Sequence, residues 1–179
     1  MESSRLASAE DLEVLAALGE RARAEMRPKR GGDVLARLDV HASALDDRMA
    51  QALADQSSVV AVGLVAGVPV AYGLMVVTEA ADGSTHAVIE ELFVEPEARS
   101  VGVGESLADL LLGIAAERGA IGVDALALPG DRATKNFFES RGMVARAIIV
   151  HRGVGDRGGS EGRNSVQERW RSTMACCFW

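Results

Sequence analysis

The amino-acid sequence predicts an α/β (α+β) fold in which a mixed, mostly antiparallel central sheet is flanked by helices. Three observations support this fold class. Two amphipathic helical patterns precede residue 55, β-branched apolar runs with short turns fill residues 58–94, and a glycine-containing turn then leads into another helix. The expected order of elements along the chain is β-α-α-β-β-β-α-β-α-β.

The first third of the chain is predicted to be mainly helical. A short strand begins near residue 6, and leucines and alanines then recur at helical spacing over residues 9–25 until Pro28 breaks the pattern. A second helix is expected over residues 33–54. Its leucines and methionine form an apolar stripe, and Arg48 belongs to the side turned to solvent.

The next segment is predicted to be an antiparallel meander of three strands. Residues 58–65 and 68–77 flank the turn Ala66-Gly67, which is the pattern of a hairpin. A second turn at residues 81–84 contains the residue types that form turns, and it leads to a strand over residues 86–94.

The C-terminal half alternates helices and strands. A helix follows the glycine turn, and the continuous apolar run 121–128 predicts a strand buried on both faces. Asp131 is placed to cap a helix over residues 132–141, and Gly142 is its stop signal. Residues 143–151 are expected to form the last strand.

Composition indicates one domain followed by a tail. The 179 residues are 48% hydrophobic and 25% charged, and residues 1–152 are long enough to build one substantial core. Residues 153–179 start with a glycine-rich, charged stretch that is typical of a flexible linker. The alternative is that the aromatic end of this tail packs onto the core or onto a partner chain.

Charge and the potential ligand residues exclude several classes of function. The net charge of −7 argues against nucleic-acid binding, which needs a basic surface. The sequence has no apolar run as long as a membrane span and no signal-peptide pattern. Cys176 and Cys177 are adjacent and the three histidines are scattered, so we expect a cytoplasmic protein without disulfides or a metal site.

The most informative motif joins the strand 86–94 to the following helix and reads Arg99-Ser-Val-Gly-Val-Gly104. Closely spaced glycines at a helix start let an anion approach backbone N–H groups. A Walker-type loop would continue with lysine and then serine or threonine, but Glu105 follows, and a dinucleotide-binding fingerprint would have glycine in place of Leu107. A simple turn without a ligand is the remaining alternative.

The spacing Arg99-x-x-Gly102-x-Gly104, directly after an apolar strand, resembles the acyl-CoA signature of the GNAT superfamily of N-acyltransferases. Residues 131–143 resemble the final-helix motif of the same family, commonly Asn-x-x-Ala-x-x-x-Tyr-Glu-x-x-Gly-Phe. The two motifs occur in the family's order, and the resemblance extends over residues 5–152. It implies an N-acetyltransferase in which a primary amine attacks the thioester of acetyl-CoA directly.

The resemblance also implies which residues bind the cofactor. In the family, the glycine loop grips the pyrophosphate of coenzyme A, and a backbone N–H at the end of the preceding strand polarises the thioester carbonyl. The implied cofactor-binding residues are Phe93, Val94, Arg99, Ser100, Val101, Gly102, Val103, Gly104, Glu105, Asp131, Asn136 and Phe138.

Four positions of the final-helix motif depart from the family pattern, of which Met143 in place of the last phenylalanine is an exchange of similar volume. Asp131 stands at the usual asparagine, Thr134 at the alanine, and Phe138 at the tyrosine that protonates the leaving thiolate. A phenyl ring has no proton to give, so that role is vacant or is supplied from elsewhere.

Glu90 and Glu91 are the predicted catalytic residues. The acceptor amine must lose a proton, and a carboxylate that acts directly or through water is the usual helper. Because strand side chains alternate, the two glutamates are expected on opposite faces, Glu90 with Leu92 and Glu91 with Phe93, unless a bulge reverses the assignment. Glu90 is the first choice, and the alternative that both merely face solvent stays open.

The sequence therefore predicts a cytoplasmic, acetyl-CoA-dependent N-acetyltransferase. Its acceptor is a small-molecule or protein amine, nucleic acid, membrane and metal are not expected, and a homodimer is left open. The alternative is an acyl-CoA-binding or regulatory domain of the same fold with little or no turnover, which Phe138 favours. A module that binds NAD is a third possibility, and Leu107 argues against it.

Overall fold

The computed structural model describes residues 1–38 and 45–152 of the chain. Met1–Val144 form one compact unit, and the chain from Ala145 onward belongs to a second. The predictions that lie outside the described residues concern the tail 153–179, the centre of the helix 33–54, His41, Cys176 and Cys177.

Helices and strands follow one another in nearly the predicted order within the described residues. In chain order they are β1 (Glu2–Leu6), the 3-10 turn η1 (Ala9–Asp11), α1 (Leu12–Met26), α2 (Gly32–Leu38), α3 (Leu45–Ala54), β2 (Ser58–Val65), β3 (Val68–Glu79), β4 (Thr85–Val94), the 3-10 turn η2 (Pro96–Ala98), α4 (Val103–Glu117), β5 (Ala120–Ala125) and α5 (Arg132–Ser140).

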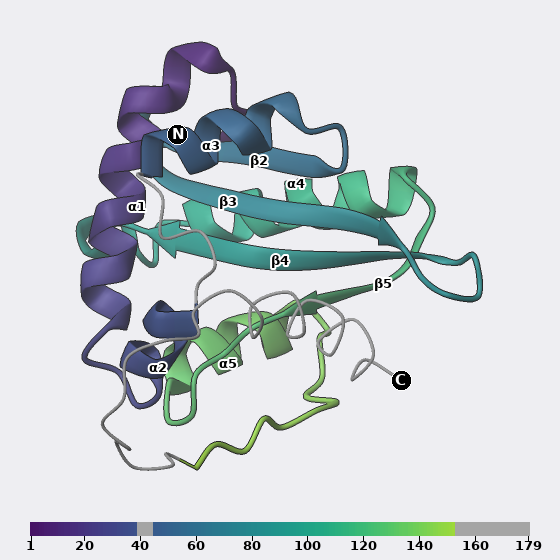
Figure 1. Cartoon of the computed structure of the whole chain (residues 1–179). Coiled ribbons are helices and arrows are strands. Elements are labelled where there is room, and N and C mark those ends of the chain that lie inside the picture. Colours follow the sequence, from purple (N-terminus) through teal and green to yellow (C-terminus); the bar gives the residue numbers. More distant parts are fainter. Residues whose placement is uncertain (39–44, 153–179) are drawn as a thin grey trace, which may run out of the picture. The chain divides into compact units, whose positions relative to one another are not determined.

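The strands form one sheet in the order β1-β2-β3-β4-β5. Figure 1 shows β2, β3, β4 and β5 in this order. The pairs from β1 to β4 are antiparallel, and two hairpin turns join β2, β3 and β4. β4 and β5 are parallel, because the chain returns through α4 before it enters β5. This arrangement confirms the predicted fold class of a mixed, mostly antiparallel sheet flanked by helices.

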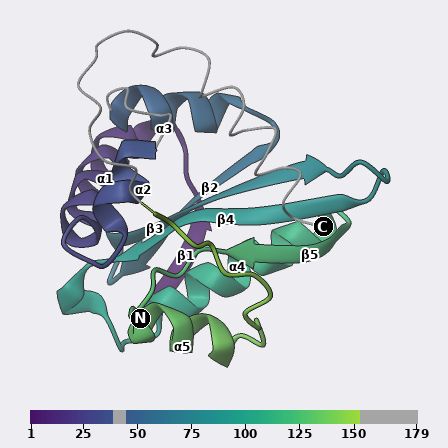
Figure 2. The same cartoon turned by 60° about the horizontal axis from the view of Figure 1, so that its bottom comes forward.

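Side chains that alternate along the strands divide the core into two clusters, one on each face of the sheet. On one face, Leu15 of α1 and Met49 of α3 pack on strand residues that include Tyr72. On the other face, Leu107 of α4 and Phe138 of α5 pack on the intervening strand residues. Figure 2 shows α1, α2 and α3 on one side of the strands and α4 and α5 on the other.

Two strand glycines let α4 approach the sheet closely. A Cβ at Gly63 would lie 2.8 Å from Val103 Cγ2, and a Cβ at Gly73 would lie 2.7 Å from Leu111 Cδ1, and neither distance is tolerable. Glycine in a strand often marks such a close approach. These contacts fix the start of α4, and therefore the position of the glycine loop that precedes it.

The sheet has a gap between its two parallel strands. β5 pairs with β4 only from Thr85 to Ile89, and β5 ends at Ala125, which is the partner of Ile89. β4 runs on to Val94 and stays paired with β3 throughout. Within the described part of the chain, residues 90–94 therefore have a strand partner on one edge only.

A β-bulge interrupts β4 at Glu90. Leu74 of β3 is opposite Glu91, and the next pair in register uses Ile89, so Glu90 is the extra residue. The extra residue resets the alternation of side chains, and both glutamates contact Arg48 of α3. The expected exception of a bulge therefore applies: Glu91 lies on the face of Phe93, as predicted, but Glu90 lies on that face too and not on the face of Leu92.

Two predictions about the last strands are also wrong. β5 ends at Ala125 instead of residue 128, and its Ile121 is 76% exposed, so the strand is not buried on both faces. The described residues 143–152 contain no strand, although they are rich in β-branched side chains. Strand formation depends on pairing and packing more than on local propensity, and sequence pattern reports only the propensity.

The N-terminal corner of the unit is held by an ion pair between Arg5 of β1 and Asp11 of η1. Both guanidinium NH groups donate to the carboxylate, at 2.7 and 2.8 Å, and the backbone N–H of Ser8 donates to it as well. The hydrogen bond from Arg5 is the main cause that lowers the pKa of Asp11 from 3.8 to about 2. The charged carboxylate therefore contributes to stability at neutral pH.

We expect Asp11→Asn to lower the free energy of unfolding by about 1–2 kcal/mol at pH 7. Because the pKa of Asp11 is lower in the folded state, this contribution is present in full above pH 4 and is lost as the pH falls towards 2. Urea unfolding of both proteins at pH 7 and at pH 3 measures it. If the free energy of unfolding of Asp11→Asn is lower than that of the wild type by the same amount at pH 3 as at pH 7, the charged carboxylate of Asp11 is not the cause of the difference.

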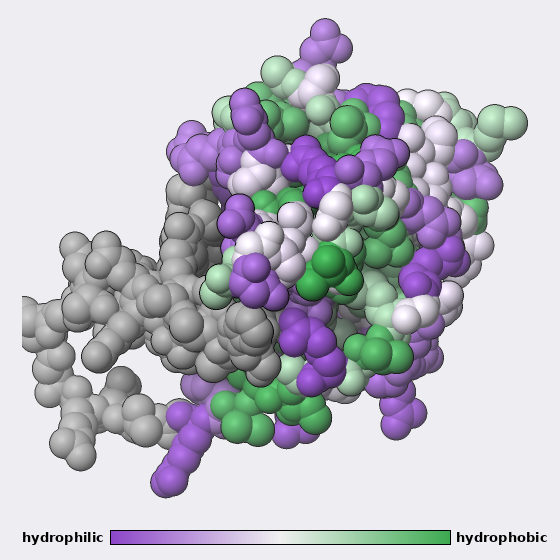
Figure 3. Space-filling view, turned by 90° about the vertical axis from the view of Figure 1, so that its right-hand side faces the viewer, coloured by the Kyte–Doolittle hydropathy of each residue, from purple (hydrophilic) through white to green (hydrophobic). Residues whose placement is uncertain are grey.

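The described residues contain no helix that is long and apolar enough to cross a membrane. They also contain no group of three or more histidine, cysteine, aspartate or glutamate side chains that is placed to hold a metal ion. On the face drawn in Figure 3, hydrophobic residues lie in small patches among hydrophilic ones.

Candidate active site

The open edge of β4 presents backbone groups to the gap in the sheet. The N–H of Glu95 donates to Val70 O on the β3 side at 2.9 Å. Successive residues of a strand direct their backbone groups to alternate edges, so the groups of Val94 and Leu92 point into the gap. The 3.0 Å hydrogen bond from Arg99 Nε to Val94 O agrees with this direction. An extended ligand with amide groups can pair with this edge as a strand would.

The loop between β4 and α4 has the backbone of an anion site. Ser100 has a φ of 68° and Gly102 a φ of 95°, both in the left-handed region. Residues in this region next to a helix start can turn successive N–H groups towards one point. Gly102 is the N-cap of α4 and, as a glycine, it has no side chain to cap the helix, although a Cβ there would lie 3.4 Å from Cγ of Glu2. The N–H groups of the first turn, residues 103–105, are therefore available to an anion.

Arg99 lies where the gap meets this loop. Its Nε holds Val94 O, and its guanidinium carbon lies 5.9 Å from the centre of the Phe93 ring. One terminal NH group donates to Glu25 Oε2 of α1 at 2.5 Å. The side chain is 43% exposed. The predicted cofactor residues Phe93, Val94 and Arg99 are thus brought together at the end of β4.

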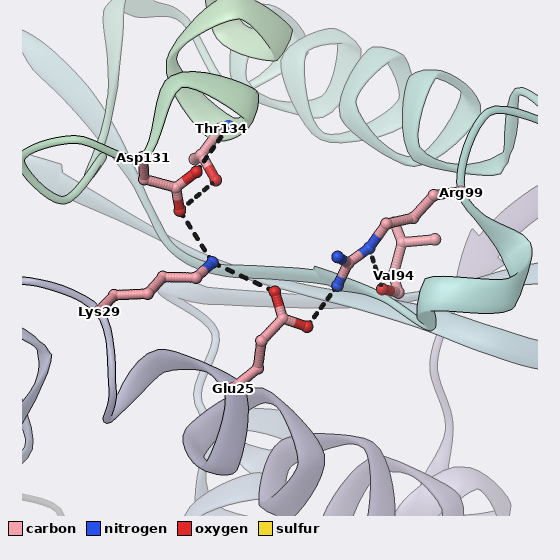
Figure 4. Close-up of polar contacts among 6 residues, drawn as sticks. All are labelled: Glu25, Lys29, Val94, Arg99, Asp131 and Thr134. Atoms are coloured by element: carbon pink, nitrogen blue, oxygen red, sulfur yellow. Dashed lines mark hydrogen bonds and ion pairs between the residues drawn. The ribbon is translucent and has the colours of Figure 1, made fainter.

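A chain of ion pairs connects Arg99 to the start of α5 (Figure 4). Glu25 binds Arg99 with one carboxylate oxygen and Lys29 Nζ with the other, the latter at 3.2 Å. Lys29 Nζ also donates to Asp131 Oδ2 at 2.9 Å. Asp131 in turn accepts the backbone N–H of Thr134 at 3.1 Å and so caps α5, as predicted.

The groups of this chain hold one another in their charged forms. Burial raises the pKa of Glu25, but the hydrogen bonds from Arg99 and Lys29 outweigh it and keep the pKa below its ordinary value. Burial lowers the pKa of Lys29, but the contacts with Asp131 and Glu25 outweigh that effect and raise the pKa. Burial likewise raises the pKa of Asp131, and Lys29 with Thr134 lowers it further than burial raises it.

The other predicted residues of α5 differ in their surroundings. Asn136 is exposed on the helix surface. Phe138 is only 9% exposed and belongs to the apolar cluster under α4. Phe137, which packs edge-on against Phe138, is the ring that approaches Gly104, since a Cβ there would lie 3.5 Å from Phe137 Cε2.

The two predicted catalytic carboxylates lie together on the face covered by α1 and α3. Arg48, whose side chain is 9% exposed, contacts Glu90 Oε2 at 3.4 Å and also pairs closely with Glu91. Glu91 accepts a second hydrogen bond from the hydroxyl of Tyr72. Burial, reinforced by the Glu91 charge, raises the pKa of Tyr72 well above its ordinary value, so this hydroxyl stays protonated and donates.

Sequence reasoning missed four residues of this site. Arg48 was predicted to face solvent but is buried, because its charge is compensated by Glu90 and Glu91. Tyr72, Glu25 and Lys29 also went unassigned. Two weak signals for them were present, since Tyr72 is the only tyrosine of the chain and Glu25 and Lys29 have the spacing of a helical ion pair.

Comparisons with known proteins agree with this arrangement. The family model described as "Acetyltransferase (GNAT) family" matches residues 25–143, which include the whole of β4, the glycine loop and α5. No curated protein is significantly similar to the chain in sequence.

Several solved structures have the same fold. A tetramutant of a Bacillus halodurans protein is 16% identical with a TM-score of 0.72, over 84% of this chain and 99% of the other. The ribosomal-protein-alanine N-acetyltransferase of Brucella melitensis biovar Abortus 2308 is 17% identical with a TM-score of 0.65, over 86% and 99%. An aminoglycoside acetyltransferase from an uncultured soil metagenomic sample, in complex with sisomicin, is 18% identical with a TM-score of 0.64, over 87% and 97%.

Proposed function

This chain belongs to the GNAT family of acetyltransferases, and from that membership we propose that it transfers the acetyl group of acetyl-CoA to a primary amine by direct attack. The observation that carries the proposal is the juxtaposition of the open β4 edge with the glycine loop. The edge offers backbone groups to an extended chain, and the loop offers uncapped N–H groups to an anion.

These features fit acetyl-CoA. Its pantetheine arm is an extended chain with two amide groups, which can pair with those backbone groups of the open edge that Arg99 does not already hold. Its pyrophosphate matches the N–H groups of residues 103–105 and the Arg99 guanidinium. With the pyrophosphate on the loop and the arm along β4, the thioester lies towards the bulge, where Val94 or Leu92 N–H can polarise its carbonyl.

Glu90 is the better candidate for the base that accepts the proton of the amine. Its side chain is 38% exposed and has one long contact with Arg48, so its oxygens are open to an acceptor or to a bridging water. Glu91 is 21% exposed and is held by both Arg48 and Tyr72. Its role is to position Arg48 and, through Arg48, Glu90. The acceptor amine accordingly approaches from the face covered by α1 and α3.

A second candidate function is an acyl-CoA-binding domain with little turnover, and Phe138 is the observation that favours it. Phe138 is buried among apolar side chains, so this position supplies no acid for the leaving thiolate. The Tyr72 hydroxyl is committed to Glu91 on β4. Under the first function coenzyme A leaves as a thiolate and then takes a proton from solvent. No enzyme acid is needed, because a thiolate is only weakly basic and is a good leaving group.

Release of free thiol from acetyl-CoA distinguishes the two functions. The full chain is incubated with acetyl-CoA and a panel of amines that includes an aminoglycoside, a polyamine, and alanine- and lysine-containing peptides. We expect thiol release that depends on one of these amines and saturates with its concentration. Acetyl-CoA binding without acceptor-dependent release from any amine would favour the second function.

A further inference from the structure

Two cationic side chains beside the glycine loop share a single carboxylate. Glu25 reaches Arg99 with one oxygen at 2.5 Å and Lys29 with the other at 3.2 Å. Arg99 and Lys29 come from different parts of the chain, and Glu25 is the anion between them. All three side chains are between 32% and 43% exposed, so a ligand can reach them.

This group of side chains lies at the gap in the sheet. Glu25 and Lys29 come from α1 and the turn after it, on one face, and Asp131 caps α5, on the other face. Lys29 nevertheless contacts Asp131 at 2.9 Å, and a Cβ at Gly31 would lie 3.9 Å from Leu128 Cδ2. Such contacts between opposite faces pass beyond the end of β5, where the described residues place no other strand next to β4.

The donors of Arg99 are partly used by the protein itself. The Nε group holds Val94 O, and one terminal NH group holds Glu25. Nη2 of Arg99 holds Glu25, and this nitrogen belongs to both pairs of neighbouring NH groups through which an oxyanion can bind a guanidinium. A phosphate bound through either pair therefore lies beside the Glu25 carboxylate, and the two compete for Nη2 because their like charges repel each other at this distance.

We propose that Glu25 is an internal competitor for the phosphate-binding site of Arg99. In the free protein its carboxylate holds the guanidinium, and an oxyanion of the incoming acyl-CoA takes its place while Glu25 stays with Lys29. Glu25 thereby lowers the affinity for the cofactor and speeds the release of coenzyme A after transfer. This inference rests on the proposed function, since it takes the ligand of Arg99 to be a cofactor phosphate.

Calorimetric titration of the full chain with acetyl-CoA tests the competition. We expect Glu25→Gln to bind acetyl-CoA about three- to fivefold more tightly than the wild type, the upper part of the range for an ion pair of this exposure. The gain should be absent when Glu25→Gln is combined with Arg99→Met, because the contested donor is then gone. Glu25→Asp keeps the charge but shortens the side chain, and we expect a smaller gain.

Glu95→Gln is the matched control. Glu95 lies just before the same loop but pairs with Arg21 instead of Arg99, so its substitution removes one negative charge nearby without touching the competition. We expect its affinity for acetyl-CoA to stay within about twofold of the wild type.

The outcomes separate this inference from the proposed function. If the wild type binds acetyl-CoA, and neither Glu25→Gln nor Glu25→Asp binds it more tightly, the competition is overturned but the proposed function is not. An equal increase in affinity for acetyl-CoA when Glu25→Gln is made in the Arg99→Met background would also overturn the competition. The same increase in Glu95→Gln would overturn it too, because the loss of any nearby negative charge would then explain the effect. No binding of acetyl-CoA by any variant would overturn the proposed function and the competition together.

Discussion

Gly102→Val is expected to abolish measurable binding of acetyl-CoA. Gly102 has a φ of 95° at the N-cap of α4, and a β-branched residue there costs about 1–3 kcal/mol if the backbone keeps its conformation. The loop will instead rearrange and misdirect the N–H groups of residues 103–105. Loss of two or more hydrogen bonds to a charged group weakens binding by about a hundredfold or more. Calorimetry with acetyl-CoA measures it.

Gly83→Val is the control for backbone strain. Gly83 has a φ of 82° in the turn between β3 and β4, and a Cβ there would meet open space. Its substitution should lower stability to a similar degree and leave the affinity for acetyl-CoA unchanged. Gly104→Val is less informative, because a Cβ at Gly104 would already lie 3.3 Å from Val94 Cγ2. Unchanged affinity in Gly102→Val would show that the loop does not bind the cofactor.

Glu90→Gln is expected to lower turnover by about a hundredfold or more, because the amide keeps the shape of the side chain but accepts no proton. Acetyl-CoA affinity should not change. Glu91→Gln should lower turnover by about tenfold, since it disturbs Glu90 only through Arg48, and it should also reduce stability because a buried ion pair is lost. Steady-state kinetics across pH, with the amine found by thiol release, measure both variants.

Glu79→Gln is the matched control for these variants. Glu79 is an exposed residue at the end of β3, in register with Thr85 at the other end of β4, so its substitution should leave the rate unchanged. If neither Glu90→Gln nor Glu91→Gln loses rate at any pH, the carboxylate is not the base. Positioning of an amine that is already neutral would then be the better account.

The parts of the fold that local patterns control could be predicted from the sequence. Turn residues and alternating apolar runs placed β2, β3 and β4 to within two residues, and capping signals placed α5. The length of β5 and the missing last strand depend on pairing between distant segments. Residues 121–128 and 143–151 have suitable β-branched composition, but composition does not say whether a segment pairs with an edge strand of the sheet, or with which one.

The candidate site divides in the same way. The glycine loop is continuous in sequence, so its residues could be named in advance. A bulge near Glu90 could be named as a possibility, but its presence could not be predicted, because a register shift arises from the fit of β4 to β3 and reverses every later side chain. Arg48, Glu25 and Lys29 are distant in sequence from the groups they contact, and only the packing of α1 and α3 on the sheet brings them there.

Hydrogen–deuterium exchange of the full chain with and without acetyl-CoA tests most directly where the cofactor binds. We expect acetyl-CoA to slow exchange in peptides that cover residues 90–105, because the N–H groups of Leu92, Val94 and the first turn of α4 become hydrogen-bonded. Peptides from the turn between β3 and β4 should not change. If acetyl-CoA binds but leaves exchange over residues 90–105 unaltered and slows it elsewhere, the cofactor does not bind at the β4 edge and the glycine loop.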